Sequence, residues 1–307
     1  MGELVLVTGG AGFIGSHVCE ALLGRGYRVR VLDNLSLGRR EWVPSDANLE
    51  FIRGDICDVE ACRAACGGVE GVFHLAAMSK VAPSVGDPSM VQYCTEQNVL
   101  GTLNVLDAAR AAGVKKVVYS ASSTYYGNRP PPHREDMPPD CLNPYALTKY
   151  AGEQYCELFD KMYDLPAVSL RYFQVCGPRQ PTDGPYAVVA GIFIEQKRRG
   201  VPLTIHGDGS QRRDFVHVRD VAEANVRAYE SGARRMVINV GTGVSHSIKE
   251  LADMISDDQV SGLPRRGGDS DATLADTSRC EEMLGWRPSI KFGDMVDEML
   301  AAGRPAS

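Results

Sequence analysis

A tyrosine and a lysine stand four residues apart, at Tyr145 and Lys149. In a helix that begins after Asn143 and Pro144, this spacing places both side chains on one face. A free phenol has a pKa of about 10, but a neighbouring ammonium group favours its ionised form. The pair therefore suits general-base chemistry, in which Tyr145 takes a proton from a substrate hydroxyl.

A serine-rich segment precedes this pair and ends a predicted strand over residues 115–121. Ser122 can present its hydroxyl to the same substrate oxygen as Tyr145. An isolated Tyr-x-x-x-Lys spacing also fits an exposed pair on a helix surface. The catalytic interpretation therefore depends on a cofactor site elsewhere in the chain.

Three glycines, Gly9, Gly12 and Gly15, follow an apolar run over 3–8 and lead into an amphipathic segment. The first glycine permits a tight turn, the second lets the backbone approach a pyrophosphate, and the third lets the helix pack on the strand. The phosphates then meet the positive end of the helix. The pattern predicts a dinucleotide-binding turn, the alternative being an ordinary strand-to-helix turn.

An acidic residue, Asp33, ends the next predicted strand over 28–33. Its carboxylate would accept hydrogen bonds from ribose hydroxyls and repel a 2′-phosphate, which favours NAD over NADP. Arg39 and Arg40 follow six and seven residues later, and these two positive charges leave NADP as an alternative cofactor. With a nicotinamide cofactor bound, Tyr145 would take the proton of a substrate hydroxyl while a hydride leaves the carbon that carries this hydroxyl.

Short β-branched runs alternate with helical patterns in the first half of the chain, which predicts an α/β fold with a doubly wound parallel Rossmann sheet. A smaller C-terminal lobe is expected to bind the substrate. The predicted strands lie near 3–8, 28–33, 50–53, 71–75, 115–121, 166–171 and 236–240. The predicted domains are 1–174 with 215–245 for NAD, and 175–214 with 246–307 for the substrate.

The composition excludes several other functions. The net charge of −6 argues against nucleic-acid binding and against anionic membranes. No apolar run reaches the length of a membrane span. Nine cysteines lack paired spacing, so we expect no zinc or other metal site. The N-terminus enters the first strand directly, and we expect a cytoplasmic protein without a signal peptide.

The chain resembles the extended short-chain dehydrogenase/reductase family, and within it the nucleotide-sugar 4-epimerases. The similar motifs are TGGAGFIGSH, GDICD, HLAAMSKV, SASSTYYG, NPYALTK, LRYFQVCGPRQ, GDGSQRRDFVHVRDV and NVGTG. The resemblance implies a homodimer, a UDP-sugar substrate, and catalytic roles for Ser122, Tyr145 and Lys149. The cofactor contacts that it implies are Gly9, Gly12, Phe13, Ile14, Gly15, Asp33, Asn34, Asp55, Ile56, Leu75, Ala76, Ala77, Asn98, Tyr145 and Lys149.

The resemblance also implies a set of substrate contacts. Arg213 and Arg266 match arginines that clamp the diphosphate, and Asp269 matches a residue that binds the nucleotide ribose. Gln174 replaces the asparagine usual at its position, and Lys80 points either to the sugar or to solvent. The full set is Lys80, Ser122, Ser123, Thr124, Tyr145, Gln174, Arg213, Arg266, Asp269 and Thr273.

Two positions bear on the reaction and on the sugar. Dehydratases and decarboxylases similar to this chain carry an acid where Thr124 stands, so the resemblance favours epimerisation at carbon 4 through a 4-keto intermediate. Similar epimerases restricted to plain hexoses carry a tyrosine where this chain has Thr273. The smaller residue leaves room for UDP-GlcNAc and UDP-GalNAc beside UDP-Glc and UDP-Gal.

Three alternatives remain open at this point. One is a UDP-glucuronate 4-epimerase, whose substrate carboxylate Lys80 would neutralise. Another is a 4-ketoreductase or dehydratase of the same family. The third is an NAD(H)-binding sensor without catalysis, which has no need for Tyr145 and Lys149.

Overall fold

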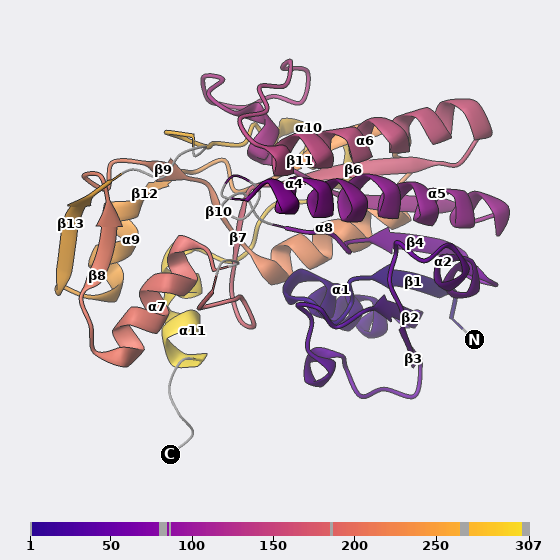
Figure 1. Ribbon diagram of the computed structural model, residues 1–307, viewed down its shortest axis with the longest axis horizontal. Coiled ribbons are helices and arrows are strands. Elements are labelled where there is room, and N and C mark those ends of the chain that lie inside the picture. The colour runs from indigo at the N-terminus through magenta and orange to yellow at the C-terminus, as the bar shows by residue number, and fades with distance from the viewer. Residues whose placement is uncertain (1, 80–84, 86, 185–186, 265–269, 303–307) are drawn as a thin grey trace.

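The computed structural model describes residues 2–79, 85, 87–184, 187–264 and 270–302. Its centre is a seven-stranded sheet in the order β11-β6-β5-β4-β1-β2-β3, in which every neighbouring pair is parallel (Figure 1). This confirms the predicted doubly wound Rossmann sheet. The strands are β1 Leu4–Thr8, β2 Arg28–Asp33, β3 Leu49–Arg53, β4 Gly71–His74, β5 Lys116–Ser122, β6 Ala167–Tyr172 and β11 Met236–Val240.

The strand order reverses between β1 and β4, because successive strands run outward on either side of this point. In open parallel sheets, ligands bind beyond the carboxyl ends of the strands at such a switch point. The glycine turn follows β1, and the serine-rich segment follows β5. The topology therefore brings both predicted motifs to one edge of the sheet.

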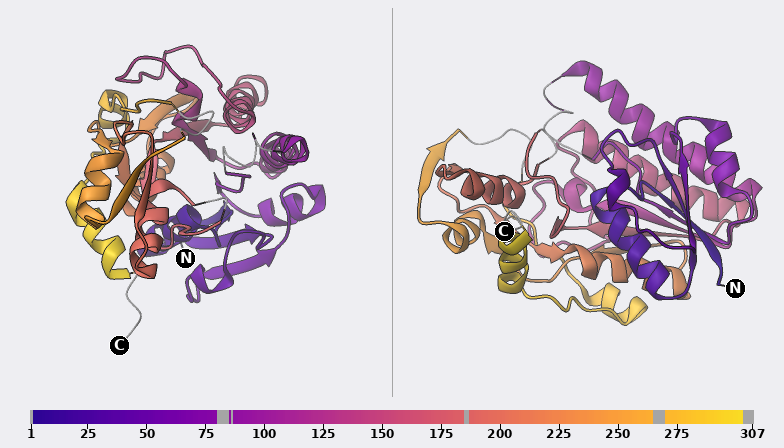
Figure 2. Two further views of the ribbon diagram at one scale, coloured as in Figure 1. Left: turned by 60° about the vertical axis from the view of Figure 1, so that its left-hand side comes forward. Right: turned by 90° about the horizontal axis from the view of Figure 1, so that it is seen from below.

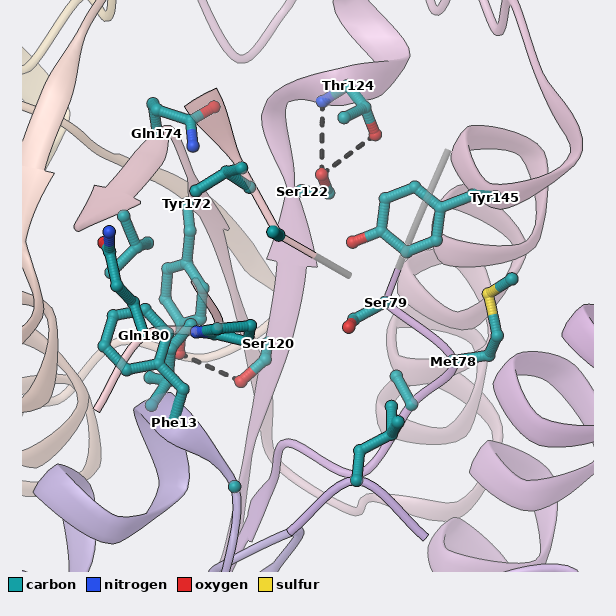
Figure 3. Close-up of a pocket in the computed structure, with 18 of the residues that line it drawn as sticks. Phe13, Met78, Ser79, Ser120, Ser122, Thr124, Tyr145, Tyr172, Gln174 and Gln180 are labelled. Atoms are coloured by element: carbon teal, nitrogen blue, oxygen red, sulfur yellow. Dashed lines mark hydrogen bonds between the residues drawn. The ribbon is translucent and has the colours of Figure 1, made fainter. Parts of the chain in front are cut away.

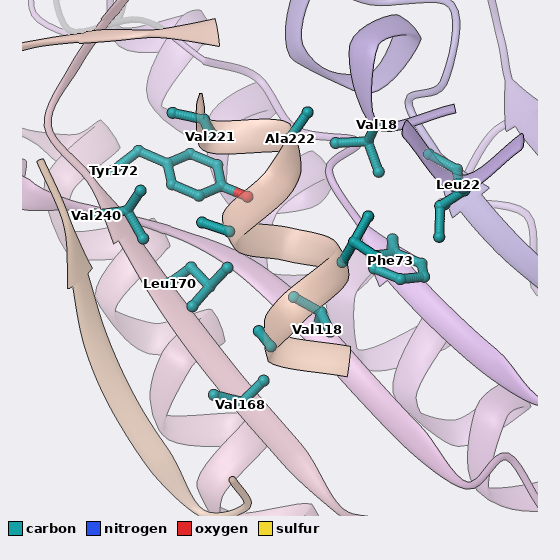
Figure 4. Close-up of a cluster of buried hydrophobic side chains, with 14 of the residues drawn as sticks. Val18, Leu22, Phe73, Val118, Val168, Leu170, Tyr172, Val221, Ala222 and Val240 are labelled. Carbon is teal, nitrogen blue, oxygen red and sulfur yellow. The ribbon is translucent and has the colours of Figure 1, made fainter. Parts of the chain in front are cut away.

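Helices cover both faces of the sheet, since parallel strands that are buried on both sides need cover on each. All seven residues of β5 are buried. On one face lie α1 Phe13–Gly24, α8 Val218–Glu230 and α10 Ser278–Leu284, and Figure 4 shows α8 packed among side chains of α1 and the central strands. On the other face lie α2 Val59–Cys66, α5 Gly101–Ala111 and α6 Pro144–Tyr163.

A second group of elements lies beyond the carboxyl ends of the strands (Figure 1, Figure 2), and its buried side chains form a second hydrophobic core. Its strands form small pairs, β7 with β10, β9 with β12, and β8 with β13. The elements are β7 Gln174–Cys176, α7 Val189–Arg199, β8 Leu203–His206, β9 Arg212–Arg213, β10 Phe215–His217, β12 His246–Ser247, α9 Ile248–Ile255, β13 Gln259–Leu263 and α11 Phe292–Ala302.

The division of the chain into two domains stays a proposal, and the packing adds detail to it. Within the segment 246–307, α11 joins the second core through Met295, whereas Cys280 and Trp286 join the Rossmann core. The chain therefore passes back over the Rossmann sheet before it ends. Among the described residues, no helix is both long enough and apolar enough to cross a bilayer.

Candidate active site

A cleft of about 1300 Å³ lies between the Rossmann sheet and the second core. Most of the residues predicted from the sequence line it, although they come from segments far apart in the chain. These are Gly9, Gly12, Phe13, Ile14, Gly15, Asp33, Asn34, Ile56, Leu75, Ala76, Ala77, Ser122, Ser123, Thr124, Tyr145, Lys149, Gln174, Arg213 and Thr273. Asp55 and Asn98 do not line it, and Lys80, Arg266 and Asp269 lie outside the described residues.

The glycine turn has the close backbone geometry that a dinucleotide requires. Gly9 has a φ of +72°, and a Cβ placed there would lie 2.7 Å from the backbone nitrogen of Ala76. A Cβ on Gly15 would lie 2.1 Å from the carbonyl oxygen of Gly9. Helix α1 begins after Gly12 and has no side-chain cap, so its first N–H groups face the cleft without a competing side chain. The turn therefore fits a bound pyrophosphate.

Asp33 lies at the end of β2 with its carboxylate held by backbone donors. Its Oδ2 accepts from the nitrogen of Ala11 at 3.0 Å and its Oδ1 from that of Leu35 at 2.8 Å. Burial raises the pKa of Asp33, and these hydrogen bonds oppose the rise. Each oxygen keeps a second lone pair for a ribose hydroxyl, so the site fits NAD.

Two further residues predicted as cofactor contacts, Asp55 and Asn98, do not line the cleft but hydrogen-bond to residues that do. Asp55 accepts a hydrogen bond from the Asn34 amide at 2.8 Å and so orients Asn34, which lines the cleft. Asn98 is fully buried in the π-helical turn η2 Glu96–Leu100. Its amide bonds the backbone nitrogen and oxygen of Met78 at 2.7 and 2.9 Å, and donates to Thr148 Oγ1 at 3.0 Å. Asn98 therefore ties the cleft wall after β4 to helix α6.

Sequence reasoning missed a buried hydrogen-bond chain beneath the same wall. The Ala76 nitrogen donates to Thr8 Oγ1, which bonds His74 Nδ1 at 2.7 Å. His74 Nε2 bonds Thr102 Oγ1 at 2.9 Å, and this hydroxyl donates to the carbonyl of Asn98. Burial lowers the pKa of His74 to about 3, so the ring is neutral. The sequence pattern that could have indicated this chain is a polar residue at the end of each of two apolar strands, Thr8 in β1 and His74 in β4.

Ser122 and Tyr145 face each other in the cleft, as Figure 3 shows. Ser122 Oγ accepts from the Thr124 nitrogen at 3.2 Å and shares a hydrogen bond with Thr124 Oγ1 at 2.9 Å. Burial raises the pKa of Tyr145 to about 12, and a hydrogen bond with Ser122 opposes the rise. The phenol is therefore neutral in this structure and needs positive charge nearby to act as a base.

Lys149 supplies positive charge one helical turn after Tyr145. It is 3% exposed, and its Nζ lies 4.2 Å from the centre of the Tyr119 ring, within the range of a cation–π contact. Burial lowers the pKa of Lys149 to about 8. The ammonium form is thus the major form at neutral pH, but the pKa lies only about one unit above pH 7.

We expect the charge of Lys149 to be lost as pH rises through about 8, because its pKa is depressed from the usual value. The measurement is an NMR titration of protein labelled with ¹³C-lysine, with the resonance assigned by Lys149→Met. The value of kcat/KM should fall over the same range, since the phenolate then loses its neighbouring cation. A midpoint for Lys149 above pH 10 would contradict this assignment.

A buried arginine supports the turn that carries Ser123 and Thr124, η3 Ser123–Tyr126. Arg171 binds Glu153 of α6 with bonds of 3.0 and 2.7 Å and lies over the rings of Tyr125 and Tyr126. Tyr125 donates its hydroxyl hydrogen to Glu153. The turn and helix α6 are thereby fixed to the same buried ion pair.

A second buried carboxylate, Asp214, organises the part of the cleft that contains Arg213 and Thr273. It accepts from the backbone nitrogens of Thr242 at 2.7 Å, Gly243 at 3.0 Å and Ala275 at 3.0 Å. Its own nitrogen donates to Thr273 Oγ1 at 3.3 Å. Asp214 therefore sets the position of Thr273 and of its neighbour in sequence, Arg213.

Comparison with known proteins assigns the family. The model of the NAD dependent epimerase/dehydratase family matches residues 5–241. The chain is 41% identical to the UDP-glucose 4-epimerase of Mycolicibacterium smegmatis over 302 residues, which cover 95% of each protein. The chain belongs to the NAD-dependent epimerase/dehydratase family, which confirms the resemblance and the NAD cofactor predicted from the sequence.

Two solved structures are similar over nearly their whole length. One is the UDP-N-acetylglucosamine 4-epimerase of Methanobrevibacter ruminantium M1 in complex with UDP-N-acetylmuramic acid, with 36% identity, a TM-score of 0.92 and 98% of both chains covered. The other is a mutant UDP-glucuronic acid 4-epimerase of Bacillus cereus in complex with UDP-4-deoxy-4-fluoro-glucuronic acid and NAD. It has 30% identity, a TM-score of 0.90 and 98% of both chains covered.

Proposed function

We propose that this protein is a nucleotide-sugar 4-epimerase that interconverts the carbon-4 epimers of a UDP-sugar through a transient 4-keto intermediate. The observation that carries the proposal is the hydrogen-bonded pair of Ser122 and Tyr145 in one cleft with the NAD-binding turn. The names of the similar proteins support it, since they include 4-epimerases of three UDP-sugars. Position 124 carries a hydroxyl, so no carboxylate stands there for dehydration.

The side chains of the cleft have separate roles in this reaction. Bound NAD would accept the hydride from carbon 4. Ser122 holds the sugar's 4-hydroxyl and Tyr145 takes its proton. Lys149 favours the phenolate and would hold the nicotinamide ribose. After the keto sugar turns about its diphosphate, Tyr145 returns the proton to the oxygen of the opposite epimer. Arg213 and Arg266 would hold the diphosphate, for which the forked donors of arginine are suited.

The reaction class can be tested with purified protein and no added cofactor, using UDP-glucose, UDP-N-acetylglucosamine and UDP-glucuronate. NMR should show a mixture of the two carbon-4 epimers of at least one sugar. Stoichiometric consumption of added NADH would instead indicate a ketoreductase, and a stable keto product would indicate a dehydratase. Tight NAD binding without turnover of any sugar would favour the remaining alternative, an NAD(H)-binding sensor without catalysis.

For the sugar itself, we propose that the protein acts on UDP-N-acetylglucosamine as well as, or better than, on UDP-glucose. Thr273 lines the cleft, and its hydroxyl accepts a backbone hydrogen bond from Asp214, so the side chain is held in place. A side chain of this size leaves space for an N-acetyl group in either pose of the sugar. UDP-glucuronate is the second candidate, with Lys80 as the partner of its carboxylate.

We expect Thr273→Tyr to remove activity on UDP-N-acetylglucosamine selectively, because well-packed sites relieve a steric clash poorly. The measurement is kcat/KM for this sugar and for UDP-glucose. Thr273→Val, which keeps the size but loses the hydrogen bond to Asp214, is the control and should keep the wild-type preference. Equal loss of both sugars in the tyrosine variant would refute the role of position 273.

We also propose that the protein is a cytoplasmic homodimer. Three apolar side chains lie 11 and 4 residues apart on one face of α6 and are exposed, Leu147 by 57%, Leu158 by 42% and Met162 by 59%. Helices carry such exposed apolar rows where they pack on another chain. Light scattering should give the mass of a dimer, and the double variant Leu158→Glu with Met162→Glu should give the mass of a monomer.

The proposed location in the cytoplasm rests on the cysteines. All nine are free thiols, as expected in a reducing compartment.

A further inference from the structure

The segment 177–183 leaves β7 in the second core and forms one wall of the cleft through Gln180, Pro181, Thr182 and Asp183. Phe13 and Ile14, at the start of α1, line the same cleft. Figure 3 draws Gln180 and Phe13 among the side chains that line this cleft, and the ion pair of Arg179 with Glu20 places the segment against α1, the helix that follows the glycine turn. A dinucleotide held by that turn has the segment as a neighbour.

The segment has a defined conformation that its own hydrogen bonds maintain. The side chain of Gln180 accepts from the Gly177 nitrogen at 3.1 Å, and the Gln180 nitrogen donates to the Gly177 carbonyl at 3.3 Å. Between them, Arg179 has a φ of +66°, which is uncommon for a residue with a side chain. Such a conformation persists where the surrounding contacts require it, and here the Gln180–Gly177 hydrogen bonds act together with the contacts of the Arg179 side chain.

The guanidinium group of Arg179 connects the segment to the Rossmann part of the chain. It forms an ion pair with Glu20 on α1 and donates to the carbonyl of Trp42 at 3.4 Å, in the turn η1 Arg40–Trp42. The Arg179 side chain is only 23% exposed. Both partners lie on the Rossmann side of the cleft, whereas the segment itself comes from the other side. Movement of the segment away from α1 would break both contacts.

We propose that Arg179 is a cofactor-retention residue, whose ion pair with Glu20 fastens the segment 177–183 over the glycine-turn end of the cleft and slows the release of NAD. Retention matters because an epimerase uses the same NAD for both hydride transfers, although the release rate itself does not depend on the proposed reaction.

The chain offers a control at the far end of the same helix. Arg25, the C-cap residue of α1, pairs with Glu223 at 2.6 Å and with Glu230 at 2.7 Å, both on α8. Its side chain is 38% exposed, against 23% for Arg179, and α8 does not line the cleft. Loss of this pair loosens α1 without releasing the segment 177–183.

The test is the exchange of resident NAD for isotopically labelled NAD in the purified holoenzyme, followed by mass spectrometry in the absence of any sugar. Arg179→Asn suits this test because asparagine tolerates a positive φ, and Glu20→Gln removes the charge of the partner. Both should speed exchange by about threefold to tenfold, and Arg25→Asn should leave it within about twofold of wild type. High salt should speed exchange in the wild type but not in Arg179→Asn.

Activity provides a second readout. When diluted without cofactor, Arg179→Asn should lose turnover with time, and added NAD should restore it. Exchange at the wild-type rate in both Arg179→Asn and Glu20→Gln would overturn the proposal, as would equal acceleration in Arg25→Asn. If the protein epimerises no sugar but these exchange rates are as expected, the retention role stands and the proposed reaction fails.

Discussion

Replacing Tyr145 by phenylalanine should lower turnover by at least about 100-fold, the scale expected when a general base is lost. The ring and its packing remain, so NAD should stay bound in normal amounts. The measurement is kcat with the best UDP-sugar, together with the NAD content of the purified variant. Burial raises the pKa of Tyr145 to about 12, so this hydroxyl needs a nearby cation to serve as a base, a role that we propose for Lys149.

Tyr150→Phe is the matched control, because Tyr150 lies on the same helix but does not line the cleft. It should keep turnover within about threefold of wild type. Near-normal turnover in Tyr145→Phe would show that another group is the base.

Replacing Gly15 by alanine should weaken NAD binding by about 10- to 100-fold and lower activity with it. The added Cβ would lie 2.1 Å from the Gly9 carbonyl oxygen. Because this oxygen belongs to the backbone, no side-chain rotation can relieve the clash. Helix α1 must then move away from β1, which displaces the N–H groups that face the pyrophosphate. Loss of one hydrogen bond to a charged group costs about 1.5–3 kcal/mol, and 1.4 kcal/mol is about tenfold in affinity. Calorimetric titration of the variant with NAD provides the measurement.

Gly24→Ala is the control for this variant. Gly24 ends the same helix, and nothing lies within 4 Å of a Cβ placed there. Alanine should therefore keep NAD affinity and stabilise the helix by roughly 0.5–1 kcal/mol. If Gly15→Ala binds NAD as tightly as Gly24→Ala does, the close approach at Gly15 has no part in cofactor binding.

The Rossmann strands could be predicted to within a residue because buried parallel strands leave a strong local pattern. The run at 28–33 and the run at 236–240 coincide with β2 and β11. The strands of the second core left no such pattern. They are as short as two residues, as in β9 and β12, and their pairing is set by tertiary contacts between segments far apart in the chain.

The cleft-lining residues could be predicted where a motif places them, as at Gly9 and Tyr145. Residues that act through others were not visible in the same way. Asn98 was predicted as a cofactor contact, and the sequence did not reveal that its amide, in a π-helical turn, also bonds Met78 and Thr148. Asp214 follows Arg213, which was predicted as a substrate contact. Its own role could not be predicted, because the three backbone N–H groups that donate to its carboxylate are brought together only by folding.

The most direct measurement of the proposed reaction uses a UDP-sugar that carries deuterium at carbon 4. With purified protein in ordinary water and without added cofactor, NMR should show the opposite epimer with its deuterium still at carbon 4, because the hydride passes to the resident NAD and returns to the same carbon. In heavy water, the unlabelled substrate should gain no deuterium at that carbon. Loss of the label to solvent, or deuterium at carbon 5 or 6, would contradict a 4-epimerase that works through a transient 4-keto sugar.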